Sequence, residues 1–231
     1  MRISEIFHSL QGEGPDTGVS TVFIRLQGCL AGCKWCDTKY SWGEGGEELS
    51  INEIMSRVTG INNCSASVYI TGGEPLEQEQ ELKKLVSELI RNDYWVTVAT
   101  NGTLPRPTWW NKVIWDVDCK CPSSGVSVFD WAWATIGKKN RIKFVVSDET
   151  DLRFVEEMLS QLYIKAITFC PTILVSPVIP GRGRGLLVVD RSVEWRQKIW
   201  MQKVWNFCIK YNLRYSLQVH KVVFGNRKRG V

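Results

Sequence analysis

Three cysteines stand close together near the start of the chain in the pattern Cys-x3-Cys-x2-Cys: Cys29, Cys33 and Cys36. Thiolates are the protein ligands of iron–sulfur clusters, and a loop of this length can turn three of them toward one centre. A closed cluster takes four ligands. Three cysteines would leave one iron atom of a [4Fe–4S] cluster open to a small molecule, so the pattern predicts a cluster that takes part in a reaction.

Residue types alone leave two other interpretations of these cysteines open. A structural zinc site takes four protein ligands, usually as two pairs, and the fourth ligand here would be His8, His220 or a distant cysteine. The thiols could also be unligated core residues, since buried single cysteines are common. The lack of a second ligand pair in the sequence disfavours zinc, and three thiols around Gly32 and Lys34 disfavour the core.

The composition predicts one soluble domain spanning residues 1–231. The chain is 44% hydrophobic, enough to bury a core, and its net charge of +5 is too small to indicate direct nucleic-acid binding. We interpret the basic tail 226–229 as a solvated terminus, with RNA contact as the alternative. Glu5 stands near the start with no apolar signal core after it, and no apolar run approaches a membrane span. We therefore expect a reducing, cytoplasmic location.

The cysteine loop follows an apolar run, residues 19–26, in which β-branched side chains dominate, so a strand is expected there. Alternate residues of a strand face opposite sides, which places Arg25 on one face with Phe23 and Gln27. A barrel-facing arginine needs an anion, and its planar fork suits a carboxylate. The anion that pairs with Arg25 could be the carboxylate of a ligand or a glutamate at the rim of the barrel.

Further strands and helices alternate along the rest of the chain. The expected strands are 67–71, 95–100, 112–117, 141–146, 164–170 and 215–219. The expected helices are 51–58 with a capping box of Ser50 and Glu53, then 82–90, 152–162 and 192–211. Residues 1–18 are expected to form a loop, as is 181–185. This alternation predicts an α/β, barrel-like sheet of mostly parallel strands.

Motifs outside the cysteine loop resemble two nested families. Residues 71–75, Thr-Gly-Gly-Glu-Pro, and 99–102, Ala-Thr-Asn-Gly, resemble the radical S-adenosylmethionine (SAM) superfamily. The motifs that resemble the 7-carboxy-7-deazaguanine synthase family are residues 10–14, 23–29, 36–38, 118–125 and 218–221. They follow that family's order, so the resemblance covers nearly the whole chain.

The resemblance implies a fold and an activity. The fold would be a partial, incomplete TIM-like barrel of the radical SAM type, with five to six parallel strands. The activity would be that of a carbon–nitrogen lyase, which converts 6-carboxy-5,6,7,8-tetrahydropterin to 7-carboxy-7-deazaguanine with loss of ammonia, as in queuosine-type biosynthesis. The implied cofactors are a [4Fe–4S] cluster, SAM and Mg2+. The implied partners are the pterin, an electron donor such as flavodoxin or ferredoxin, and a second copy in a homodimer.

The resemblance also implies a role for each matching residue. Cys29, Cys33 and Cys36 would hold the cluster, and Thr38 would offer oxygen to Mg2+. The implied SAM contacts are Gly73, Glu74, Asn101, Asp118, Cys119, Lys120 and Ser176. The implied pterin contacts are Leu10, Gln11, Gly12, Glu13, Arg25, Thr71 and His220, with Arg25 at the substrate carboxylate. Ala99 replaces the glutamate common in the superfamily, so a carboxylate role is lost at that position.

Two other functions stay open beside this one. A radical SAM activase, which abstracts hydrogen from a glycine of a partner protein, should lack the pterin contacts at Glu13, Arg25 and Thr38. A zinc-bearing interaction module would have no catalysis. A second cluster at Cys119 and Cys121 is disfavoured, since alternate residues of an extended chain face opposite ways.

Overall fold

The computed structural model describes residues 1–61, 65–165, 171–179, 191–224 and 229–230. Its strands are β1 (Arg2–Leu10), β2 (Ser20–Leu26), β3 (Glu47–Glu48), β4 (Ser67–Gly72), β5 (Trp95–Thr100), β6 (Ile114–Asp118), β7 (Arg141–Val146), β8 (Thr172–Pro177) and β9 (Arg214–Tyr215). Its α-helices are α1 (Ile51–Ile61), α2 (Glu79–Arg91), α3 (Glu149–Lys165), α4 (Arg191–Tyr211) and α5 (Val219–Phe224). Short 3-10 turns join several of these elements.

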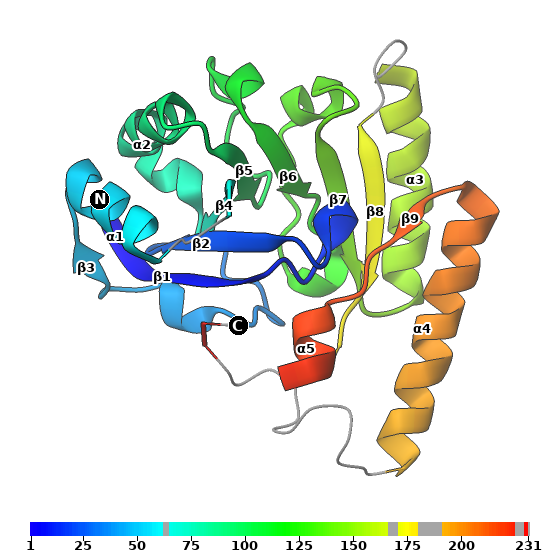
Figure 1. Ribbon diagram of the computed structural model, residues 1–231. Coiled ribbons are helices and arrows are strands. Elements are labelled where there is room, and N and C mark those ends of the chain that lie inside the picture. The colour runs from blue at the N-terminus through cyan, green and yellow to red at the C-terminus, as the bar shows by residue number, and fades with distance from the viewer. Residues whose placement is uncertain (62–64, 166–170, 180–190, 225–228, 231) are drawn as a thin grey trace.

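The strands form one sheet in the order β3-β1-β2-β4-β5-β6-β7-β8-β9 (Figure 1). Every neighbouring pair from β2 to β9 is parallel, whereas β1 runs antiparallel to both β2 and β3. The sheet is open, because β3 and β9 form its two ends. The predicted α/β class with mostly parallel strands is therefore confirmed.

One face of the sheet packs against helices α1 to α4 and forms the hydrophobic core. On β2 this face carries Val22, Ile24 and Leu26, all fully buried, as the alternation predicts. The opposite face carries Phe23 and Arg25, which line a cavity. The core thus fixes the sheet from one side and leaves the other side free for a site. None of the helices in these residue ranges is long and apolar enough to cross a membrane.

Several predicted elements are confirmed in detail. Strands β5 and β7 have the predicted bounds, and α4 begins one residue before the predicted helix. The capping box before α1 is present, with the Ser50 N–H donating to Glu53 Oε2 at 2.8 Å and the Glu53 N–H donating to Ser50 Oγ at 3.3 Å.

Three predictions about elements were wrong. Residues 2–10 are a strand and not a loop, because pairing with β2 over the whole length of β1 outweighs a weak apolar pattern. Residues 164–165 end α3, and the next strand is β8, which Pro171 precedes and Pro177 closes. Prolines at the ends of a strand remove few ladder hydrogen bonds, so they do not exclude it. The strand expected at 215–219 is confined to β9, and His220 lies in α5.

The remaining predictions about segments fall partly outside the described residues. These are the loop 181–185, most of the strand 164–170, and residues 226–228 of the basic tail.

Candidate active site

A cavity of about 320 Å³ opens on the face of the sheet opposite helices α1 to α4, toward the carboxyl ends of the parallel strands. The ends of such strands are where barrel enzymes place their reacting groups. All three cysteines of the predicted cluster loop line this cavity. The loop, strand ends and α5 converge there from positions far apart in the sequence.

Two glycines set the position of the cysteine loop. The Gly73 N–H donates to Leu26 O at 3.0 Å, and the Glu74 N–H donates to Gly28 O at 2.7 Å. A Cβ atom on Gly73 would lie 1.7 Å from Gly28 O, and Gly72 has a φ of 127°, which side chains disfavour. Glycine at both positions lets the end of β4 lie directly against the backbone that leads into Cys29.

The donor set of the loop fits an iron–sulfur cluster better than a zinc ion. Among the described residues no three or more His, Cys, Asp or Glu side chains are grouped so that they could hold a metal ion, and this includes Cys29, Cys33 and Cys36 in the structure without a cluster. His8, one suggested fourth ligand, lies within hydrogen-bond distance of Ser20 instead. Cys36 Sγ accepts the Trp42 Nε1–H at 3.3 Å, and N–H donors of this kind tune sulfur ligands of clusters.

The thiols of Cys29 and Cys33 would release protons on binding a cluster. Burial raises the pKa of both thiols. Metal ligation takes the thiolate form, so cluster assembly is coupled to proton release.

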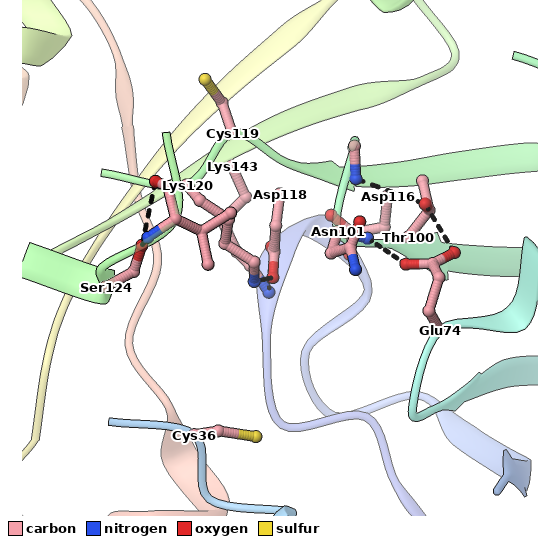
Figure 2. A network of polar contacts seen from close by, with 12 residues as sticks. Cys36, Glu74, Thr100, Asn101, Asp116, Asp118, Cys119, Lys120, Ser124 and Lys143 are labelled. Atoms are coloured by element: carbon pink, nitrogen blue, oxygen red, sulfur yellow. Dashed lines mark hydrogen bonds and ion pairs between the residues drawn. The ribbon is translucent and has the colours of Figure 1, made fainter. Parts of the chain in front are cut away.

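Glu74 ties the ends of β4 and β5 together and does not line the cavity. Its carboxylate accepts the Asn101 N–H at 2.6 Å and the Thr100 hydroxyl at 2.8 Å (Figure 2). It also accepts the Leu76 N–H at 3.0 Å. Burial raises the pKa of Glu74 to about 7 despite these donors. Glu74 thereby holds the backbone of Asn101, which does line the cavity.

A chain of charged groups crosses the cavity from β6 to the loop after β1. Lys120 Nζ lies 2.6 Å from Asp118 Oδ2, and Lys143 Nζ lies 3.2 Å from Asp118 Oδ1. The same Lys143 Nζ lies 2.9 Å from Glu13 Oε2. Figure 2 shows Lys143, Lys120 and Asp118 together and the Cys119 sulfur pointing away from them. Burial favours neutral Asp118, but Lys120 and Lys143 lower the pKa of its carboxyl group.

The chain of contacts continues from Glu13 to the cysteine loop. Gln218 Nε2 donates to Glu13 Oε1 at 2.9 Å, and Lys221 Nζ donates to Gln218 Oε1 at 2.7 Å. Lys221 also pairs with Asp37 at 2.7 Å, next to Cys36. These contacts fix the start of α5 against the loop after β1 and the cysteine loop.

His220 packs against the loop that contains Gly12. The Val219 N–H donates to Gly12 O at 2.9 Å, and a Cβ atom on Gly12 would lie 2.6 Å from His220 Nδ1. Burial lowers the pKa of His220, although Glu13 and Asp37 act in the opposite direction. Burial thus favours the neutral form of this half-buried imidazole, which lies close to Glu13.

Arg25 lines the cavity and forms an ion pair at its rim. Its Nε donates to Glu5 Oε1 at 2.6 Å, and the Tyr40 hydroxyl donates to the same oxygen at 2.8 Å. Among the described residues no hydrogen bond is recorded from the two terminal nitrogens of Arg25. The glutamate at the rim is therefore present as Glu5, and Arg25 itself lines the cavity, where a ligand carboxylate could also meet it.

The cavity brings together all but three of the predicted site residues. Those that line it are Leu10, Gln11, Gly12, Glu13, Arg25, Cys29, Cys33, Cys36, Thr38, Thr71, Gly73, Asn101, Asp118, Lys120 and His220. Glu74, Cys119 and Ser176 do not. Cys119 and Ser176 are fully buried, Cys119 within the hydrophobic core, so their side chains do not reach the cavity.

The further cavity residues that were not predicted as site residues include Asp37, Lys143, Gln218 and Lys221. Lys143 is one of two charged residues in a strand whose other residues are apolar. It lies two residues from Val145, so alternation along the strand places both on the cavity face. Gln218 and Lys221 flank His220 in a motif that the resemblance already contained. Nothing in the local sequence indicated that Lys143 would meet Glu13.

Comparisons with known proteins agree with this geometry. The model of the Radical SAM superfamily matches residues 23–114. The chain is 32% identical to the 7-carboxy-7-deazaguanine synthase of Koribacter versatilis (strain Ellin345), with both chains covered completely. It is 32% identical to the enzyme of the same name from Thermoplasma acidophilum, over 98% of each chain. It also resembles the crystal structure of QueE from Escherichia coli, with a TM-score of 0.71, 26% identity and coverage of 95% and 94%.

Proposed function

Because the chain belongs to the 7-carboxy-7-deazaguanine synthase family of the radical SAM superfamily, we propose that its cavity converts 6-carboxy-5,6,7,8-tetrahydropterin to 7-carboxy-7-deazaguanine. The reaction releases one ammonia and contracts the pterin ring. The observation that carries the proposal is that three cluster-type cysteines line the same cavity as Glu13 and Arg25. A [4Fe–4S] cluster and SAM, when bound, supply the one-electron carbon–sulfur cleavage and hydrogen abstraction that start the reaction.

Cys29, Cys33 and Cys36 hold the cluster through their thiolates in this proposal. Trp42 and Asn101 direct N–H groups toward two of the sulfurs, at 3.3 Å to Cys36 and 4.0 Å to Cys29. Such donors orient the ligands and stabilise negative charge on them.

The SAM side of the cavity is formed by the ends of β4, β5 and β6. Gly73 offers its backbone where no Cβ atom intervenes, and Asn101 offers a side-chain amide. Asp118 and Lys120 present a carboxylate and an ammonium group, which suit the amino and carboxylate groups of the methionine part of SAM. Cys119 contributes only backbone to this side, since its side chain lies in the core.

The pterin side is formed by the loop after β1, by Arg25 and by α5. Glu13 accepts hydrogen bonds from the amino and ring N–H groups of the pterin, with Gln11 and the Gly12 backbone beside it. Arg25 binds the carboxylate through its terminal nitrogens while Glu5 holds Nε. Leu10, Thr71 and His220 complete this side of the cavity.

Thr38 is the residue proposed to bind Mg2+ through its hydroxyl oxygen. It lies at the cavity, two residues after Cys36, and its Oγ1 is 3.4 Å from Cys36 Sγ. Mg2+ prefers oxygen ligands and keeps several waters, so one protein oxygen beside a substrate carboxylate is a suitable site.

The proposal extends to partners and location. We propose a single domain that works as a homodimer and receives electrons from a flavodoxin- or ferredoxin-type donor. Reduced thiols and a low-potential donor require a reducing compartment such as the cytoplasm.

An anaerobic assay of Arg25→Ala tests this function against that of an activase. With reconstituted protein, SAM, Mg2+ and the carboxypterin, the wild type should form the deazapurine and the variant should lose about 100-fold in rate, since misplaced substrates react that much more slowly. Unchanged turnover of the carboxypterin in Arg25→Ala would contradict the assigned substrate orientation. Cleavage of SAM without pterin turnover in the wild type would favour an activase.

A further inference from the structure

Lys143 occupies a place in the cavity that neither the sequence motifs nor the proposed function accounts for. It lies in β7 opposite Asp118 of β6 in the parallel register. Its side chain is only 12% exposed, and its ammonium group lies 2.9 Å from Glu13 Oε2 and 3.2 Å from Asp118 Oδ1. One buried cation therefore touches one carboxylate on the pterin side and one on the SAM side.

Each of the two carboxylates uses its second oxygen for a partner on its own side. Glu13 Oε1 accepts from Gln218 Nε2 at 2.9 Å, and Asp118 Oδ2 lies 2.6 Å from Lys120 Nζ. Among the ion pairs of the described residues, only those of Lys143 join these two groups. The positions of Glu13 and Asp118 are thus coupled through a single ammonium group.

We propose that Lys143 is a positioning residue, whose ammonium group fixes the Glu13 carboxylate beside the pterin and the Asp118 carboxylate beside SAM at the same time. This inference rests on the proposed function, because it takes Glu13 as the pterin contact. Lys143 acts through these two carboxylates and does not itself contact the reacting atoms.

The electrostatics of Glu13 support this role. Burial would raise the pKa of Glu13, but Lys143 is the largest of the influences that lower it, and the pKa lies at about 2. The other groups facing Glu13 are His220 and Lys221 of α5, Gln218, Asp37 of the cysteine loop and Tyr69 of β4. Without Lys143, a buried carboxylate with weaker partners takes up a proton more readily and no longer accepts the pterin N–H groups as an anion.

The test compares Lys143→Met and Lys143→Arg with the wild type in the reconstituted, anaerobic protein. Calorimetry measures the dissociation constants of the carboxypterin and of SAM between pH 5.5 and 8. Lys143→Met should weaken pterin binding by about 30-fold at neutral pH, since removal of one partner of a buried charge pair has effects of this size. The loss should grow as the pH falls, because protonation of Glu13 is then more complete. Lys143→Arg keeps the charge and should restore most of the affinity and the flat pH profile.

SAM binding gives the second readout. Lys120 still pairs with Asp118 in the variants, so SAM affinity in Lys143→Met should fall by less than pterin affinity. Lys203→Met is the matched control, because Lys203 pairs with Glu149 on the exposed surface of α4 and α3, and neither dissociation constant should change. Lys143→Gln, a neutral side chain with hydrogen-bonding capacity, repeats the test should Lys143→Met fail to fold.

The inference is overturned by wild-type affinity for the pterin in both neutral variants. It is also overturned by an equal loss in Lys143→Met and Lys143→Arg that does not depend on pH, because that result indicates a space-filling role. Glu13→Gln combined with Lys143→Met should bind no more weakly than the weaker single variant, since both remove the same contact. If the wild type does not bind the carboxypterin, the proposed function fails; if it binds and the neutral variants bind equally well, only the role of Lys143 fails.

Discussion

Glu5 and Arg25 lie opposite each other in the antiparallel register of β1 and β2, and Glu5 Oε1 accepts the Arg25 Nε–H at 2.6 Å. Tyr40 donates to the same oxygen, and its ring lies 6.0 Å from the Arg25 guanidinium carbon. Glu5 and Tyr40 therefore hold the guanidinium group of a residue that lines the cavity. The strand that supplies Glu5 is the one that sequence patterns missed.

Glu5→Gln tests this support of Arg25. The amide accepts a hydrogen bond but lacks the charge, so Arg25 should remain in place less often and kcat/KM for the carboxypterin should fall by about 10-fold. The affinity for SAM should be unchanged, because the SAM side lies at the ends of other strands. Steady-state kinetics and calorimetry of the same preparation measure both. A parallel fall in SAM affinity would show general damage to the cavity.

The cysteines of the chain should separate into cluster ligands and core residues. Replacement of Cys29, Cys33 or Cys36 by alanine should remove most of the iron and sulfide and the visible absorbance of a reconstituted sample. Cys121→Ala is the control, since Cys121 is fully buried with Cys119 in the core and should keep the cluster while losing stability. Deleting such a buried side chain lowers stability by about 1–3 kcal/mol. Loss of iron in Cys121→Ala at an unchanged fold would contradict the assignment.

Trp42 should tune the cluster without holding it. Its indole Nε1–H donates to Cys36 Sγ at 3.3 Å, and hydrogen bonds to ligand sulfurs stabilise the reduced, more negative state of a cluster. Trp42→Phe removes this donor and should move the midpoint potential to more negative values at unchanged iron content. Redox titration followed by electron paramagnetic resonance measures the shift. A potential equal to that of the wild type would mean that the indole does not reach the sulfur in the loaded protein.

Glu74 should make the stability of the cluster-free chain depend on pH. Its carboxyl group ionises near pH 4.5 in the unfolded chain and near pH 7 in the folded one, because burial opposes the charge. Between these values the folded chain binds more protons, so the free energy of unfolding decreases as the pH rises, in total by about 3 kcal/mol. The glutamine of Glu74→Gln cannot ionise, so the free energy of unfolding of this variant lacks this pH-dependent contribution. Denaturant unfolding from pH 4.5 to 8 should therefore show that the wild type loses stability relative to Glu74→Gln as the pH rises. A difference in unfolding free energy between the two proteins that stays constant over this range would contradict the raised pKa of Glu74.

The parts of the fold that were predicted correctly are those with strong local patterns. The strand before the cysteine loop and the amphipathic helices carry apolar patterns in their own residues, and the capping box carries its polar pair, Ser50 and Glu53, within four positions. Strand β1 carries Glu5 and His8 and depends on pairing with β2, and β8 is flanked by prolines. Their positions are decided by tertiary contacts that a single segment does not encode.

The residues of the site also divide into those that local motifs predict and those whose positions depend on tertiary contacts. Residues inside motifs, such as Glu13, Arg25 and Asn101, were predicted and do line the cavity. Glu74, Cys119 and Ser176 lie in or near motifs too, but alternation along the chain and a buried turn direct their side chains elsewhere. Lys143 meets Glu13 across 130 positions, so only the folded sheet reveals the contact.

The account depends most directly on the coupling of SAM cleavage to pterin ring contraction in this cavity. The decisive measurement is mass spectrometry of an anaerobic reaction of reconstituted protein with reductant, SAM, Mg2+ and 6-carboxy-5,6,7,8-tetrahydropterin. The account predicts 7-carboxy-7-deazaguanine and an equal amount of ammonia, and neither product with Cys33→Ala. Protein that carries its cluster and cleaves SAM but leaves the carboxypterin unchanged would contradict it.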